Sequence, residues 1–308
     1  MRMKSPTKAT YNVTNWPAYH RALVNRGSRQ FWIDLNMNWQ ASKTGKRGRN
    51  PSFSDEAILC CATLRALFQL PLRQTTGLVA SLLTLANVRW DTPEHTTLRR
   101  RDKTLKIPSL TRSAPQDLPM RLLVDSSGIK VSGPGEWYCS QHRQKSRRRW
   151  LKVPLPLNEQ SMQIEAILMT NGKAADAPQL PELLKQIMAP VAALYAEGAY
   201  EQRACYEELA ARHTRAIIPP RSDARCRKGL SSRNEAIGQI VQIGRKCGKQ
   251  LIGYHRRSKG EANMRCFKLL GEQVRSRRFD NQQNELRLRP WILNRFMALG
   301  RAQTVRVG

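Results

Sequence analysis

The stretch between Tyr254 and Lys268 constrains the fold most, because its polar residues are spaced for one face of a helix. At about 100° per residue, a sector of roughly 60° contains Tyr254, Arg257, Glu261 and Lys268. The predicted buried face lies opposite and comprises Ala262, Cys266, Phe267 and Leu270. A carboxylate flanked by cations suits a hard metal ion with phosphates on either side. A solvated helix face with ordinary ion pairs would give the same pattern.

The charge of the chain indicates a polyanionic partner. Its 308 residues include 53 Lys and Arg against 23 Asp and Glu, a net charge of +30. No apolar run is long enough to cross a bilayer, and the N-terminus lacks the apolar segment of a signal peptide. We therefore expect a cytoplasmic, nucleoid-associated protein that binds nucleic acid and no membrane. RNA remains an alternative to DNA. The seven cysteines are irregularly spaced and match no zinc-ligand pattern.

Three blocks in the chain resemble bacterial insertion-sequence transposases of the DDE type. The first is the Y-x-x-R-x-x-x-E spacing with a lysine seven residues later, which begins at Tyr254. The others are Leu122-Leu-Val-Asp-Ser-Ser-Gly-Ile-Lys130 and Tyr195-Ala-Glu-Gly-Ala-Tyr-Glu201, which resemble the segments carrying the first and second acids of an Asp-Asp-Glu triad. Because these blocks agree in order, chance is a poor explanation. Further segments similar to the insertion-sequence-five group are 217–222 and 47–55.

The resemblance implies an α/β fold, with an RNase H-like mixed-sheet catalytic core and an N-terminal all-helical helix-turn-helix-like domain. It implies a transposase that binds the terminal inverted repeats of its insertion sequence and catalyses metal-dependent strand cleavage and strand transfer. The implied catalytic and metal-binding residues are Asp125, Glu197 and Glu261, with Mg²⁺ as the ion and Mn²⁺ as a substitute. The implied partners are double-stranded DNA, both element ends and target, and further copies of the chain.

Glu197 departs from the family, which carries Asp at this position. The longer side chain moves the carboxylate by on the order of 1 Å, and Mg²⁺ requires near-ideal geometry. We therefore expect impaired activity. The alternative is a catalytically inactive DNA-binding remnant of a transposase.

The candidate DNA-binding residues come from the same face and from basic segments elsewhere. In the basic segments, cations that neutralise phosphates would give salt-dependent binding. The set comprises Tyr254, Arg257, Lys268, Arg221, Arg99, Arg100, Arg147, Arg148 and Arg149.

The predicted organisation begins with a basic N-terminal arm and loop over residues 1–53. A helical DNA-binding domain follows over 54–105, with helices at 57–70, 72–88 and 96–105 and Ser54 as the first N-cap. The remaining parts are a linker over 106–119, the catalytic core over 120–275, and a C-terminal helix and basic tail over 276–308.

Within the core we expect strands at 122–125, 150–157, 162–169, 191–195 and 216–218, and helices at 179–188 and 201–213. Asp125 would end the first strand, with a bend at Ser127 and Gly128, and Trp150 would pack in the core. Pro154 and Pro156 remove donors on one edge of the second strand, so that strand is either damaged or paired along its other edge. The basic stretch 221–250 is expected to include a mobile loop over DNA, and a helix is expected over 281–299, interrupted at Pro290.

Overall fold

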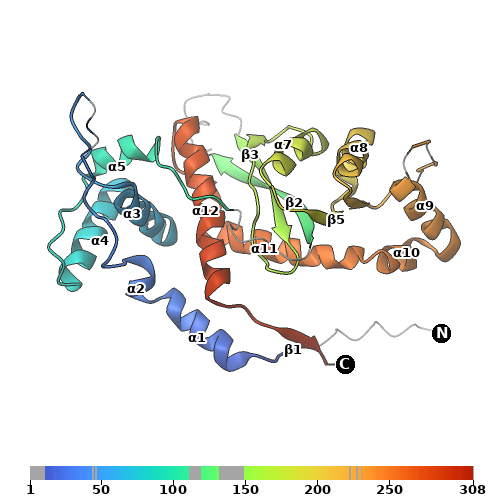
Figure 1. Ribbon diagram of the computed structural model, residues 1–308, viewed down its shortest axis with the longest axis horizontal. Helices are drawn as coiled ribbons and strands as arrows, with labels where there is room; N and C mark the ends of the chain where they lie inside the picture. The colour runs from blue at the N-terminus through green and yellow to red at the C-terminus, as the bar shows by residue number, and fades with distance from the viewer. Residues whose placement is uncertain are drawn as a thin grey trace, which may run out of the picture.

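The computed structural model describes residues 11–43, 45, 47–110, 119–131, 149–221, 223–226, 228–229 and 231–307. Figure 1 shows a helical lobe beside a core built on a sheet, with the long helix α12 (Phe279–Leu299) between them. None of the described helices is both long and apolar enough to cross a membrane.

The helical lobe confirms the three predicted helices. The first has the expected length but lies two residues earlier, and the other two are shorter than expected. The three helices are α3 (Asp55–Phe68), α4 (Leu72–Leu85) and α5 (His95–Asp102). Ser54 caps α3 as predicted, because its hydroxyl oxygen accepts a hydrogen bond from the amide of Ala57 at 3.0 Å. The apolar faces of these helices close a small core of their own, in which Trp39 stacks on Trp90.

The N-terminal segment is more ordered than an arm. Helices α1 (Trp16–Arg26) and α2 (Arg29–Trp32) are separated at Gly27, and they precede the helical lobe. Strand β1 (Tyr11–Val13) pairs antiparallel with β8 (Thr304–Arg306), so the first and last described strands lie side by side (Figure 1).

The core contains a mixed sheet with strand order β4-β3-β2-β5-β6. Strand β3 runs antiparallel to β2, whereas β5 and β7 run parallel to β2 and β6 runs parallel to β5. This order and these directions confirm the RNase H-like mixed sheet. The strands are β2 (Met120–Val131), β3 (Trp150–Asn158), β4 (Thr170–Asn171), β5 (Val191–Tyr195), β6 (Arg215–Ile217) and β7 (Gln273–Val274).

The first core strand is longer than predicted, and Asp125 lies near its middle. The expected bend is absent, because Ser127 and Gly128 continue the ladder opposite Val153 and Lys152 of β3. Trp150 at the start of β3 is 39% exposed, so the prediction that it packs in the core was wrong. Its ring instead lies 5.5 Å from the ammonium of Lys130.

The hydrogen-bonding groups of the two prolines of β3 point to the edge of β3 that faces away from β2. The carbonyls of Pro156 and Pro154 accept hydrogen bonds from the amides of Glu165 and Leu168, at 2.9 and 3.4 Å. In an extended strand, the missing N–H of a residue points the same way as its carbonyl, so the ladder with β2 is intact. The prediction of a third strand over 162–169 was wrong. Such a strand would pair with the edge of β3 where the two prolines lack N–H donors, and only an isolated bridge at Ile164 and the short β4 form there.

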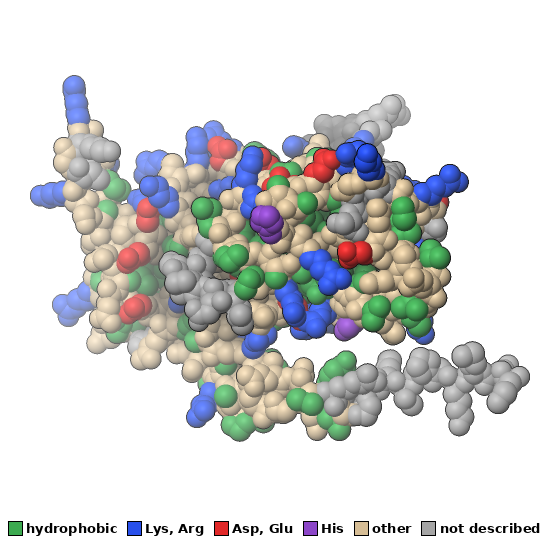
Figure 2. Space-filling view, turned by 45° about the vertical axis from the view of Figure 1, so that its right-hand side comes forward, with side chains coloured by type: hydrophobic (Ala, Val, Ile, Leu, Met, Phe, Trp, Pro, Cys, Tyr) green, Lys and Arg blue, Asp and Glu red, His purple; other side chains and the backbone are tan. Residues whose placement is uncertain are grey.

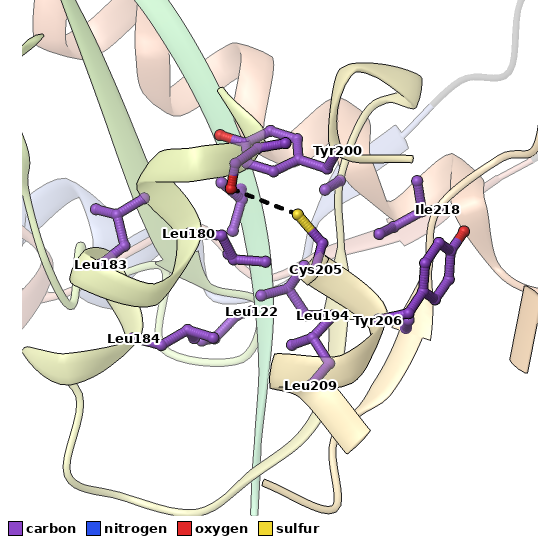
Figure 3. Close-up of a cluster of buried hydrophobic side chains, with 14 of the residues drawn as sticks. Leu122, Leu180, Leu183, Leu184, Leu194, Tyr200, Cys205, Tyr206, Leu209 and Ile218 are labelled. Carbon is purple, nitrogen blue, oxygen red and sulfur yellow. Dashed lines mark hydrogen bonds between the residues drawn. The ribbon is translucent and has the colours of Figure 1, made fainter. Parts of the chain in front are cut away.

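Helices cover both faces of the sheet. Residues such as Leu122, Val124 and Leu194 point to one face, where they pack against α7 (Leu180–Lys185) and α8 (Arg203–Ala211), as Figure 3 shows. Alternate residues of the same strands point to the other face, against α11 (Ser258–Leu269) and α12.

Most of the 221–250 segment is helical, with α9 (Ser231–Ile243) and α10 (Arg245–Leu251) forming a hairpin, and the described residues of this segment before Ser231 form no helix or strand. The predicted interruption of the last helix was wrong. Helix α12 runs without interruption through Pro290. A proline costs about 3 kcal/mol inside a helix, and the burial of Leu286, Ile292 and Leu293 on α12 offsets that cost.

Candidate active site

The sheet register places two of the predicted acids at the same level. Leu123 of β2 pairs with Tyr195 of the parallel strand β5, and Asp125 and Glu197 each follow two residues later. Both side chains are therefore directed to the face that α11 covers. Glu197 directly precedes a short turn of 3-10 helix, η2 (Gly198–Tyr200).

The third acid comes from the helix that crosses this face. Glu261 lies in the first turn of α11, and a turn of 3-10 helix, η3 (Tyr254–Arg257), leads into it. Gly260 lies directly on β2, where an added Cβ would be 3.8 Å from the Cβ atoms of Leu123 and Asp125. This close approach brings the start of α11 next to Asp125.

The guanidinium of Arg257 contacts all three acids. Its Nη2 lies 3.1 Å from Oδ1 of Asp125 and also donates a short hydrogen bond to Glu197, and its Nη1 lies 3.3 Å from Oε1 of Glu261. The Arg257 side chain is 11% exposed. Burial lowers the pKa of Arg257, but the charges of Asp125 and Glu197 outweigh it, so the pKa is raised. This arginine is therefore a fixed cation among the three acids.

The donor set fits a hard divalent cation in its chemistry, since all three ligands are carboxylates. In the described residues, no three His, Cys, Asp or Glu side chains are arranged to share one ion. Arg257 supplies the positive charge on which the acids converge. A metal ion held by the same oxygens would compete with this guanidinium for them.

A fourth carboxylate, Glu159, which the sequence analysis did not single out, fixes α11 from the other side. Glu159 follows β3, and its oxygens accept hydrogen bonds from Lys259 at 2.7 Å and Arg256 at 3.0 Å, with Arg121 at 3.8 Å. The carboxylate is 7% exposed. Burial raises its pKa, but the hydrogen bond and charge of Lys259 and the charge of Arg256 outweigh burial and lower it. Its ion pairs tie the end of β3 to η3 and to the first turn of α11.

Glu201 points away from the triad and holds the chain that follows β6. Its oxygens accept hydrogen bonds from the side chain of Arg233 at 3.0 Å and from the amide of Arg221 at 2.9 Å. Both members of the Glu201–Arg233 ion pair are buried. Glu201 is therefore structural, although it lies only four residues from Glu197.

The predicted polar face of the 254–268 segment is divided between two elements. Tyr254 and Arg257 belong to η3, and Lys268 lies in the last turn of α11. The predicted buried face was wrong except for Phe267, since Ala262 and Cys266 are exposed and Leu270 is half-buried. The helix buries the neighbouring stripe instead, because its close approach to β2 is made at Gly260. That stripe comprises Gly260, Asn263, Met264 and Phe267.

The other predicted DNA-binding residues lie on several parts of the surface. Arg99 and Arg100 are exposed on α5, and Arg149 is exposed just before β3. Arg221 is 77% exposed and lies 3.8 Å from Asp223. Arg147 and Arg148 fall outside the described residues.

Two models of protein families that share one description match this chain. A family model described as "Transposase DDE domain" matches residues 117–295, more than half of the chain, and a second model with the same description matches residues 24–134. Among solved structures, a chain of a pre-cleavage Mos1 transpososome is similar over 85% of this chain and 83% of that chain. The identity is 11% and the TM-score 0.24, so this similarity carries no argument of its own.

Proposed function

This chain belongs to the transposase DDE domain family, and from that premise we propose that it binds the terminal inverted repeats of its own insertion sequence. We further propose that it cleaves DNA there and joins the freed 3′ end to target DNA. The convergence of Asp125, Glu197 and Glu261 on one cation carries the proposal. Three acids from separate elements repel one another unless a positive charge lies between them.

In this proposal the three acids hold divalent cations, Mg²⁺ by preference and Mn²⁺ as a substitute. Ions held there would activate a water molecule and stabilise the charge that develops on the leaving oxygen. Asp125, with a 15% exposed side chain, is the anchored ligand. Glu197 and Glu261 are 51% and 62% exposed, so they are free to turn toward a ligand that arrives from solvent.

In this proposal the Arg257 side chain has two orientations. Without DNA it lies among the three acids, and with DNA it turns to a backbone phosphate, whose oxygens match the planar pair of guanidinium donors. Tyr254 would contact the same strand near Arg257, and Lys268 the next stretch of backbone. The exposed cations Arg99, Arg100, Arg149 and Arg221 would hold more distant phosphates, and several copies would assemble on the two element ends. A nucleoid location follows from this substrate.

The alternative function is DNA binding without chemistry. It is favoured by Glu197, whose extra methylene compared with Asp shifts one ligand by on the order of 1 Å. It is also favoured by the Arg257 contacts, which give the acids a stable arrangement without any metal ion.

Nicking of a supercoiled plasmid that carries the element ends tests the proposal. Cleavage at the ends should require Mg²⁺, disappear with EDTA and be abolished in Glu261→Gln, because the amide keeps the shape but loses the charge. The matched control is Glu207→Gln, an exposed acid on α8 whose partner is Arg203. Binding to the ends with no Mg²⁺- or Mn²⁺-dependent nicking would establish the inactive alternative, and equal nicking by Glu261→Gln would remove the triad assignment.

A further inference from the structure

We propose that the DNA-recognition surface is shared between the helical lobe and the start of α12, with α5 at its centre. This inference rests on the proposed DNA substrate but not on catalysis. It enlarges the expected recognition domain of residues 54–105 by adding cations that lie about 180 residues further along the chain.

Two basic pockets flank α5. One has a volume of about 310 Å³ and lies between α5 and the start of α12, lined by Thr96, Arg99, Arg100, Lys103, Arg278 and Asn281. The other has a volume of about 490 Å³ and lies between α5 and the loop that precedes α3, lined mainly by residues 49–53, Thr97, Arg100 and Arg101. Arg100 belongs to both, so the pockets form one continuous surface across the helix. Figure 2 shows basic side chains projecting from the helical lobe at the left of the view.

Most cations on this surface have no acidic partner. Among the described residues, the guanidinium groups of Arg49, Arg99, Arg100 and Arg278 form neither an ion pair nor a hydrogen bond. Lys103 has a weak contact with Asp280 at 4.0 Å. Unpaired cations from three separate elements repel one another, so an external polyanion would stabilise this arrangement.

The two walls are fixed to α5 by buried or half-buried contacts. Arg101 donates hydrogen bonds to the carbonyl of Phe53 at 2.8 Å and to Asp55, which holds the loop on one side. Asn284 of α12 donates to the carbonyls of Asp102 and Leu105, which holds α12 on the other side. The cations are therefore held in a defined arrangement before any partner binds, which lowers the entropic cost of binding.

Asn281 favours nucleic acid over a simple anion. Its side chain lines the first pocket, and its Oδ1 is shielded from solvent and has no hydrogen-bond partner among the described residues. Rotation of the amide toward the pocket would expose both of its polar groups to a ligand. A phosphate offers no donor to this oxygen, whereas the edge of a base offers both a donor and an acceptor to an asparagine amide. DNA is favoured over RNA because a helix such as α5 enters the wide major groove of B-form DNA, while that of A-form RNA is too narrow.

Fluorescence anisotropy in EDTA tests this surface separately from cleavage. The probes are a short random-sequence DNA duplex and the same sequence as double-stranded RNA. Arg278→Ala and Arg99→Ala should each weaken DNA binding by about tenfold and reduce the salt dependence by about one counterion. Arg278→Lys keeps the charge and should retain most of the affinity. The matched control is Arg287→Ala, an exposed arginine of α12 outside both pockets, which removes the same charge and should change affinity by less than about twofold.

The role of Asn281 needs a sequence-dependent measurement. Duplexes selected from a random library by the wild-type chain should bind more tightly than random DNA, and Asn281→Ala should lose about tenfold of that preference while binding random DNA unchanged. An equal loss of DNA affinity in Arg278→Ala and Arg287→Ala would show that the start of α12 is not part of the DNA-recognition surface. Tighter binding of the RNA duplex than of the DNA duplex would show that RNA, and not DNA, is the ligand of this surface. Loss of nicking with these affinities intact would disprove the proposed catalysis and leave this inference standing.

Discussion

Nη2 of Arg257 lies 3.1 Å from Oδ1 of Asp125, which places a guanidinium where the proposed metal ligands converge. The same nitrogen contacts Glu197, so one fixed cation bridges the strand β2 and the end of β5. One positive charge therefore offsets part of the negative charge of the three acids. A metal ion bound by these acids would compete with Arg257 for the same oxygens.

Arg257→Ala should increase the affinity of the DNA-free chain for Mn²⁺ by about tenfold, because the competing cation is gone. Electron paramagnetic resonance of free Mn²⁺ measures this affinity without any cleavage step. Arg265→Ala, an exposed arginine on the adjoining helix α11, controls for the loss of one positive charge. Equal Mn²⁺ affinities in the two variants would show that Arg257 does not compete with the ion.

Glu159→Gln should destabilise the core, because Lys259, Arg256 and Arg121 would then surround an uncharged amide. We expect a loss of about 1–3 kcal/mol in the free energy of unfolding, less than for a fully buried pair since the cations are partly exposed. Urea denaturation measures it. The control is Glu182→Gln, whose exposed pair with Lys185 should leave the urea midpoint unchanged.

This contribution of Glu159 should also depend on pH. The folded chain lowers the pKa of Glu159, so its stabilisation is present above the unfolded pKa of about 4.3 and is lost as the pH falls through the folded value. The difference between the wild type and Glu159→Gln should therefore shrink on acidification. A difference that grows on acidification would contradict the assigned ion pairs.

The contribution of Asp102 to stability should depend on pH in the opposite direction. Burial raises its pKa to about 6, the charge of Arg65 lowers it, and the charge of Glu285 raises it. The folded chain thus binds a proton more tightly than the unfolded chain does, and stability from this group falls as the pH rises from about 4 to 6. Asp102→Asn should gain up to roughly 3 kcal/mol relative to the wild type across that window. Urea midpoints at both ends of the window measure this gain, and a constant offset would contradict it.

The sequence predicted the elements whose signals are local. Ser54 capped the expected helix, and β5 has the expected bounds Val191–Tyr195, because capping residues and short apolar runs act over a few positions. The second half of β2 was missed because its residues Ser126 to Lys130 lack an apolar alternation. Pairing with β3 across a long stretch of sequence holds them extended.

In the candidate site, too, the sequence identified residues with local signals and missed contacts between distant segments. Spacing and resemblance singled out Asp125, Glu197, Glu261 and Arg257, but not that one guanidinium contacts all three acids. Glu159 gave no signal, since two of its cations, Arg256 and Lys259, come from η3 and α11 about 100 residues later, and the third, Arg121, comes from β2. Such contacts depend on the register of the sheet and on the approach of Gly260 to β2, which no local pattern encodes.

Glu197→Asp should raise Mg²⁺-dependent nicking at the element ends, by up to about 100-fold, if the longer side chain is what misplaces the second ligand. Mn²⁺ should partly rescue the starting chain, because its coordination is less strict. Binding to the ends should be unchanged in Glu197→Asp. Unchanged nicking in this variant, together with an essential acid elsewhere, would contradict the ligand assignment.

Mn²⁺ titration of the chain bound to a duplex of the element end, followed by electron paramagnetic resonance, tests the triad most directly. We expect Asp125→Asn and Glu261→Gln each to weaken Mn²⁺ binding by at least about tenfold, since each removes one charged ligand. Glu207→Gln on α8 should bind Mn²⁺ like the wild type. Wild-type Mn²⁺ affinity in Asp125→Asn and Glu261→Gln, with the duplex still bound, would contradict the claim that these acids form the metal site.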